Sequence, residues 1–110
     1  LAKLKIAKTN VKAKGGGVYQ IEIWIENTGY LPFPTAMGEK NRFGQPAVVE
    51  LIGNVKFLSG KKRTPIRKIK GKSVKKETWL LQSDGKPTIQ IKLSSANAWN
   101  DSKEIKLGGN

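Results

Sequence analysis

The stretch that decides the fold is Val18-Tyr19-Gln20-Ile21-Glu22-Ile23-Trp24-Ile25-Glu26. Isoleucine stands at every second position, and Gln20, Glu22, Trp24 and Glu26 fill the positions between. Because successive side chains of a β-strand point to opposite faces, this alternation predicts a strand with one buried face. We expect this strand to lie at the centre of the hydrophobic core.

Period-two patterns continue on both sides of this strand. Further strands are predicted at 3–13, 46–52, 55–58, 64–69, 74–82 and 88–93, with a last one holding Ile105 and Leu107. Turn residues separate them: Gly15-Gly16-Gly17, Ser59-Gly60-Lys61-Lys62 and Ser83-Asp84-Gly85-Lys86. The second turn is predicted to close a hairpin, and a phase slip near Thr9 and Asn10 predicts a bulge.

About seven short strands with regular turn signals predict an all-β fold, an antiparallel β-sandwich of the immunoglobulin or fibronectin type III kind. An eight-stranded barrel is the alternative architecture. The length of 110 residues fits a single domain over 1–110. Because the chain starts at Leu1 and not at methionine, we interpret it as a fragment of a larger chain.

The residue types that are missing limit the chemistry. The sequence has neither Cys nor His, so thiolate nucleophiles, imidazole bases and the usual zinc ligands are excluded. We therefore predict a domain that is not an enzyme, with no catalytic residue, no cofactor and no metal; Asn97, Asn100 and Asp101 are a weak pattern for calcium. No apolar run approaches the roughly 20 residues that a membrane span needs.

A net charge of +13 favours a polyanionic partner such as nucleic acid or an acidic wall polymer. The basic residues concentrate between positions 61 and 76, where no acidic residue occurs. A lysine-studded edge hairpin is the favoured interpretation, because lysines stop sheets from pairing edge to edge. The alternative is a polyanion contact made by Lys61, Lys62, Arg63, Arg67, Lys68, Lys70, Lys72, Lys75 and Lys76.

The aromatic and acidic residues also divide between structural and functional roles. Core packing is favoured for Trp24 and Trp79, because large aromatics dominate small cores, whereas Trp99 lies in a loop and is the most exposed candidate. Glu22 and Glu26 would lie roughly 13 Å apart on a strand, too far for a glycosidase pair. We expect them to pair with cross-strand lysines.

The element Ile23-Trp24-Ile25-Glu26-Asn27-Thr28-Gly29-Tyr30-Leu31-Pro32 resembles the domain that follows the catalytic domain in bacterial carboxypeptidase A-type zinc peptidases, and a similar Asn-Thr-Gly ending occurs in bacterial cell-adhesion-type sandwich domains. Weaker similarities cover 46–51, 72–79 and 102–107. Phe33-Pro34 departs from the family pattern. The family's zinc ligands belong to the preceding domain and have no counterpart in this sequence.

The resemblance implies a non-catalytic accessory domain of a secreted zinc carboxypeptidase-like protein, supporting stability, placement or substrate access. It implies a preceding peptidase domain as partner and a secreted or periplasmic location in a bacterium, and we expect a monomer. The long loop from 30 to 45 is a candidate interdomain or ligand contact through its apolar residues Tyr30, Leu31, Phe33 and Phe43. A cell-envelope polyanion remains the second candidate partner.

Overall fold

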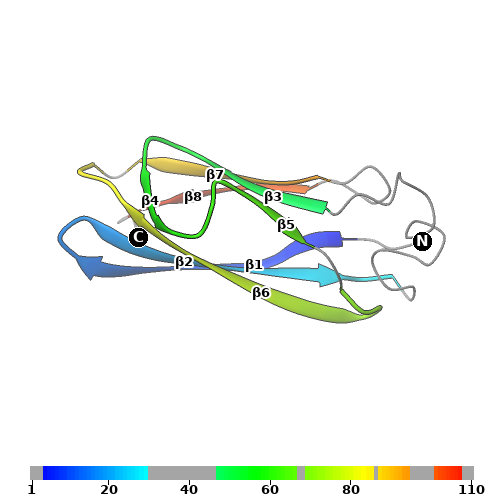
Figure 1. The fold of residues 1–110 in the computed structure, drawn as a ribbon. Coiled ribbons are helices and arrows are strands. Elements are labelled where there is room, and N and C mark those ends of the chain that lie inside the picture. The colour runs from blue at the N-terminus through cyan, green and yellow to red at the C-terminus, as the bar shows by residue number, and fades with distance from the viewer. Residues whose placement is uncertain (1–3, 30–46, 67–68, 86, 95–100, 108–110) are drawn as a thin grey trace.

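The computed structural model describes residues 4–29, 47–66, 69–85, 87–94 and 101–107. These residues form two antiparallel four-stranded sheets, with strand orders β1-β2-β6-β4 and β5-β3-β7-β8, stacked face to face (Figure 1). The all-β sandwich is therefore confirmed, and the alternative of a closed barrel is wrong. The strands are β1 (Leu4–Gly15), β2 (Val18–Asn27), β3 (Ala47–Ile52), β4 (Lys56–Ser59), β5 (Arg63–Ile66), β6 (Ser73–Gln82), β7 (Thr88–Ser94) and β8 (Asp101–Lys106).

The predicted glycine turn joins β1 and β2. Gly15, Gly16 and Gly17 have φ values of 91°, 63° and 79°, which L-residues with a Cβ rarely adopt. The bulge in β1 lies between Ile6 and Lys8, slightly before the position that the phase slip predicts. The hairpin turn and a bulge in the first strand are both confirmed.

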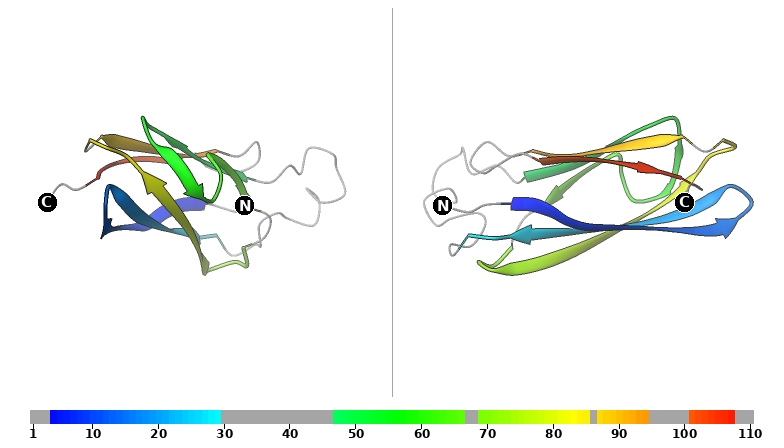
Figure 2. Two further views of the ribbon diagram at one scale, coloured as in Figure 1. Left: turned by 60° about the vertical axis from the view of Figure 1, so that its left-hand side comes forward. Right: turned by 180° about the vertical axis from the view of Figure 1, so that it is seen from behind.

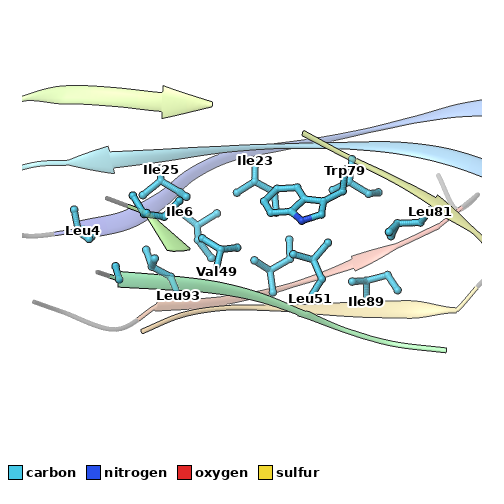
Figure 3. Packing of buried hydrophobic residues seen from close by; sticks show 14 of the residues in the cluster. Leu4, Ile6, Ile23, Ile25, Val49, Leu51, Trp79, Leu81, Ile89 and Leu93 are labelled. Atoms are coloured by element: carbon cyan, nitrogen blue, oxygen red, sulfur yellow. The ribbon is translucent and has the colours of Figure 1, made fainter. Parts of the chain in front are cut away.

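The core lies between the two sheets. Ile21, Ile23 and Ile25 of β2 are fully buried, as the alternation predicts. The second sheet contributes Val49, Leu51, Ile89 and Leu93, which are labelled in Figure 3, and also Ile91 to the same cluster. Burying each such side chain contributes roughly 1.5–3 kcal/mol. The stack of aliphatic side chains is the main force that holds the sheets together.

The predicted hairpin over 55–69 is wrong. β4 pairs with β6 in the first sheet, whereas β5 pairs with β3 in the second, so the intervening residues cross from one sheet to the other. The Trp79 indole N–H donates to the Lys61 carbonyl at 2.9 Å, and the Leu51 amide donates to the Lys62 carbonyl at 2.9 Å. The buried tryptophan of one sheet thus anchors the chain on its way to the other.

Asp101 links the sheets along the side where β1 and β8 approach each other. Its Oδ2 accepts a hydrogen bond from the Ile6 amide at 2.8 Å, and its Oδ1 accepts one from the Ser102 amide at 2.8 Å. Asp101 lies opposite Leu93 in the β7–β8 ladder, on the core-facing side of the second sheet. The carboxylate therefore satisfies a backbone donor of β1 from the other sheet.

No helix within the described residues is long and apolar enough to cross a membrane.

Substitution of Gly60 should destabilise the crossing between the sheets. Gly60 has a φ of 85°, and an added Cβ would lie 2.6 Å from Cδ1 of Trp79. We expect Gly60→Ala to lower the free energy of unfolding by about 2–4 kcal/mol in urea denaturation, since backbone strain and overpacking add.

Two other glycines separate these causes. Gly16 has a φ of 63° with nothing within 4 Å of the position that an added Cβ would take, so Gly16→Ala should show the backbone strain alone, about 1–2 kcal/mol. Gly85 has open space and no positive φ, and Gly85→Ala should change little. Equal losses at Gly60 and Gly16 would contradict the contact with Trp79.

Removal of the Asp101 carboxylate should loosen the β1–β8 side of the sandwich. Asp101→Ala leaves the Ile6 amide without its acceptor, and we expect a loss of about 1–3 kcal/mol in the free energy of unfolding. Amide hydrogen exchange should accelerate at Ile6. Ser102→Ala, which keeps the carboxylate and both amides, is the control; an unchanged exchange rate at Ile6 in Asp101→Ala would refute the link.

Candidate interaction surface

The outward side of the first sheet carries an ordered group of polar side chains, here called the Trp24 face. Cross-strand pairing places Trp24 between Lys8 of β1 and Lys76 of β6, and places Glu22 opposite Asn10. Directly opposite residues of an antiparallel pair point to the same side of the sheet. The Trp24 face consists of Lys5, Lys8, Asn10, Lys12, Glu22, Trp24, Glu26 and Lys76.

Glu22 is the most enclosed member of the Trp24 face, with only 7% of its surface exposed. Asn10 Nδ2 donates to its Oε1 at 3.0 Å, Lys12 Nζ lies 3.6 Å from Oε1, and Lys76 Nζ lies 3.4 Å from Oε2. The hydrogen bond from Asn10, supported by the charges of Lys12 and Lys76 and opposed by burial, lowers the pKa of Glu22. Glu22 is therefore held as a carboxylate.

Lysines also contact Glu26 and Trp24 on this face. Glu26 lies 3.9 Å from Lys5 Nζ, so the expected pairing of Glu22 and Glu26 with cross-strand lysines is confirmed. Lys8 Nζ lies 4.9 Å and Lys76 Nζ 5.8 Å from the centroid of the Trp24 ring, within reach of a cation–π interaction. These contacts hold the indole against the sheet.

The two tryptophans in strands have different environments. Trp79 is 1% exposed and lies in the core, as predicted. Trp24 is only half-buried, so its assignment to the core is wrong. The physical reason is that a sandwich buries one face of each sheet, and Trp24 alternates with the isoleucines that occupy that face.

The described residues of the predicted basic stretch do not gather on one face. Lys75 and Lys76 point to opposite sides of β6, and they pair with Glu77 at 3.8 Å and Glu22 at 3.4 Å. Arg63 Nη1 lies 3.1 Å from Glu50 Oε1 on the outer side of the second sheet. Lys61 and Lys62 lie in the crossing, Lys70 and Lys72 in the connection to β6, and Arg67 and Lys68 outside the described residues. Contact of this set with a polyanion stays a prediction.

Other candidate residues fall where the structure gives no description. Tyr30, Leu31, Phe33 and Phe43 lie outside the described residues, as do Asn97, Trp99 and Asn100. Asp101 uses both carboxylate oxygens on backbone amides. Within the described ranges, no three His, Cys, Asp or Glu side chains gather in a way that could hold a metal ion.

Sequence reasoning missed the Trp24 face as a unit. The usable signal was parity: Glu22 and Trp24 share one side of their strand, and Lys8, Asn10 and Lys12 recur at every second position in the strand before it. The register that places these residues opposite one another depends on the bulge after Ile6; the phase slip near Thr9 and Asn10 predicts a bulge, but not at this position.

The fold and this surface define the class of the protein: a β-sandwich domain that presents charged, preorganised side chains on strands. The chain belongs to the family described as Domain of unknown function (DUF8731), whose model matches residues 3–106. No curated protein matches the sequence.

Two solved structures with a similar fold contain archaellum periplasmic stator proteins. The archaellum periplasmic stator protein FlaG from Sulfolobus acidocaldarius has a TM-score of 0.53 and 15% sequence identity, covering 96% of this chain and 100% of that chain. A structure of the archaellum periplasmic stator protein complex FlaF and FlaG from the same organism has a TM-score of 0.51 and 12% identity, covering 96% and 90%. At such identities the likeness shows the fold.

These comparisons overturn the resemblance to a carboxypeptidase C-terminal domain. The family match is to a different family, and the similar structures are archaellum stator proteins. The zinc carboxypeptidase parent, the preceding peptidase domain as partner and the role of peptidase accessory domain were wrong, and the bacterial origin loses its support. The Asn27-Thr28-Gly29 element has a structural role at the end of β2 that needs no peptidase parent: Asn27 is fully buried, and its side chain accepts from the Gly29 amide at 3.0 Å.

The lowered pKa of Glu22 predicts how stability depends on pH. A carboxyl whose pKa is lower in the folded than in the unfolded chain stabilises the fold above its unfolded pKa, near 4.5 for Glu, and loses that contribution as pH falls through the folded pKa. We expect Glu22→Gln to unfold more easily than wild type at pH 7, with the difference shrinking to zero at pH values below the folded pKa.

The measurement is urea denaturation over a pH series. Glu104→Gln, which removes an exposed carboxylate from β8, is the control for the loss of one negative charge. A difference between wild type and Glu22→Gln that stays constant across the series would contradict the role of the ionised carboxylate.

Proposed function

We propose that this domain is a non-enzymatic structural module of the cell envelope that works by binding another protein in a surface assembly. The observation that carries the proposal is the match to FlaG, which is described as a periplasmic stator protein and is covered over its whole length. One of the similar structures is a complex of two such proteins, FlaF and FlaG. Two-protein assembly is thus a known use of this architecture.

The chemistry of the chain supports a structural role. The sequence lacks His and Cys, which removes imidazole and thiolate catalysis. The described carboxylates of Glu22, Glu26, Glu50 and Glu77 lie within 4 Å of a lysine or arginine, where they neutralise cations on the sheets. Side chains held in this way are suited to shaping a surface.

The rigidity of the sandwich supports the same role. The crossing under Trp79 joins the sheets on one side, and the Asp101 link to Ile6 joins them on the other. A module fixed on both sides transmits a mechanical load without sliding of one sheet over the other, which suits a stationary part of an assembly.

The proposal predicts location and partnership in the organism that carries the gene. The tagged chain should fractionate with the cell envelope and be digested by protease added to intact cells, because its module would lie outside the membrane. Chemical crosslinking should recover a specific envelope protein. A cytoplasmic protein followed in the same fractions is the control.

Deletion of the gene should impair a surface structure, with motility measured as one readout, while a secreted hydrolase activity stays unchanged. Recovery of the tagged chain in the cytoplasm, resistant to external protease, would overturn the proposal.

A further inference from the structure

The first sheet has an edge that is only partly covered. β6 is ten residues long, whereas its outer neighbour β4 has four and pairs only with Leu80, Leu81 and Gln82. Figures 1 and 2 show β6 continuing well past β4. Residues 73–79 therefore have β2 on one side and, within the described part of the chain, no strand on the other. We call residues 73–79 the open β6 edge.

An edge strand offers a row of backbone N–H and C=O groups that can pair with a further strand. Exposed apolar side chains near this edge also favour contact with a partner. Among the described residues, the exposed large hydrophobic side chains are Val74, 52% exposed, and Leu58, 42% exposed. Val74 lies on the open β6 edge, and Leu58 lies on β4 at the point where the covered part of β6 begins. Both exposed apolar residues thus flank the same edge.

The edges formed by β5, β8 and β1 carry features that hinder pairing. β5 contains Pro65, which lacks a backbone donor. β8 carries Lys103 on its core-facing side, opposite Ile91, and an inward-pointing charge opposes the addition of a strand. β1 is bulged after Ile6, whose amide is already bound to Asp101.

The open β6 edge is guarded in a different way, by charge that a suitable partner would cancel. Lys75 projects on the core-facing side, opposite Ile25, and Lys76 on the outward side, opposite Trp24. Lys70 and Lys72 precede the edge, and Lys61 lies beside its far end, where its carbonyl accepts from Trp79. The described carboxylate on the edge itself, Glu77, lies 3.8 Å from Lys75. Lys76 also lies 3.4 Å from Glu22, and the described lysines around the edge still outnumber the carboxylates.

We propose that the open β6 edge binds an extended acidic segment of a partner protein by β-strand addition. The inference rests on the proposed function and names the surface that the assembly uses. Backbone hydrogen bonds would supply the pairing, and carboxylates on both faces of the added strand would meet Lys75 and Lys76. A neutral or basic strand, including a second copy of this chain with its net charge of +13, is disfavoured because it would bring no carboxylates to an edge where lysines outnumber the acidic side chains.

The test uses the chain with the acidic peptide Thr-Val-Glu-Glu-Val-Glu-Glu-Thr, capped at both ends, followed by NMR. Chemical-shift changes should concentrate in residues 73–79. In the free protein, amides of this edge should alternate between slow and fast exchange, because only every second one faces β2. In the complex the fast ones should slow down.

Two controls separate strand addition from simple charge attraction. The same peptide N-methylated on both residues of its first Glu-Glu pair keeps its charge but loses one backbone donor on each side of the strand, and it should not bind. Lys75→Gln combined with Lys76→Gln should weaken binding about tenfold or more, whereas Lys92→Gln combined with Lys106→Gln, the same charge change on exposed residues of the second sheet, should have a small effect. Thermal unfolding of each variant checks that the fold persists.

Three results would overturn the proposal: equal binding of the methylated peptide, shifts centred on the second sheet, or uniform amide protection of residues 73–79 in the free protein. The last would mean that this chain or a second copy already covers the edge, and light scattering distinguishes the two. If the protein localises to the envelope but does not bind the peptide, only the proposed binding edge is refuted. A cytoplasmic location would refute the proposed function itself.

Discussion

The crossing from the first sheet to the second depends on one contact, that of the Trp79 indole with the chain above it. The ring fills the core next to Ile23 and Leu51 (Figure 3), and its N–H binds the Lys61 carbonyl at 2.9 Å. Only a glycine allows the backbone to lie against the ring, because a Cβ at position 60 would be 2.6 Å from Cδ1 of Trp79. The next carbonyl, that of Lys62, accepts from Leu51 and starts the pairing of the second sheet. This contact thus buries the Trp79 ring, gives the indole N–H its acceptor and requires the positive φ of Gly60.

The imbalance of charge imposes a second constraint. With 21 basic and 8 acidic residues, each carboxylate can be placed among several lysines. Glu22 has Lys12 and Lys76 within 4 Å, and Lys76 also lies over the Trp24 ring. Surface ion pairs of this kind contribute little individually, but a shared carboxylate with a hydrogen bond from Asn10 fixes the position of several side chains. The remaining lysines leave a positive surface that favours negatively charged partners.

Local patterns were sufficient for the strands and most turns. The isoleucine alternation in β2, the glycines before it and the alternation through Ile89, Ile91 and Leu93 each depend on neighbouring residues, and the structure confirms them. The hairpin at Ser59–Lys62 was wrong because both arms are short, and the local pattern of a short strand does not specify which sheet the strand joins. The environment of Trp24 was wrong for a related reason: aromatic size favours burial, but the side of the strand decides it. The basic stretch could not be placed because successive strand residues, such as Lys75 and Lys76, face opposite ways.

The same limits explain why a shared fold does not specify a partner. The core requires apolar residues on the inner faces, and FlaG reaches a similar backbone at 15% identity. The difference in length between β4 and β6 arises from how the strands pair, and the sequence of neither strand alone predicts it. Where β4 ends, β6 has no further neighbouring strand among the described residues, and the core does not dictate which side chains surround its backbone groups there. Specificity can therefore vary at such an edge without cost to the sandwich, which makes the lysines at 75 and 76 more informative about partners than any buried residue.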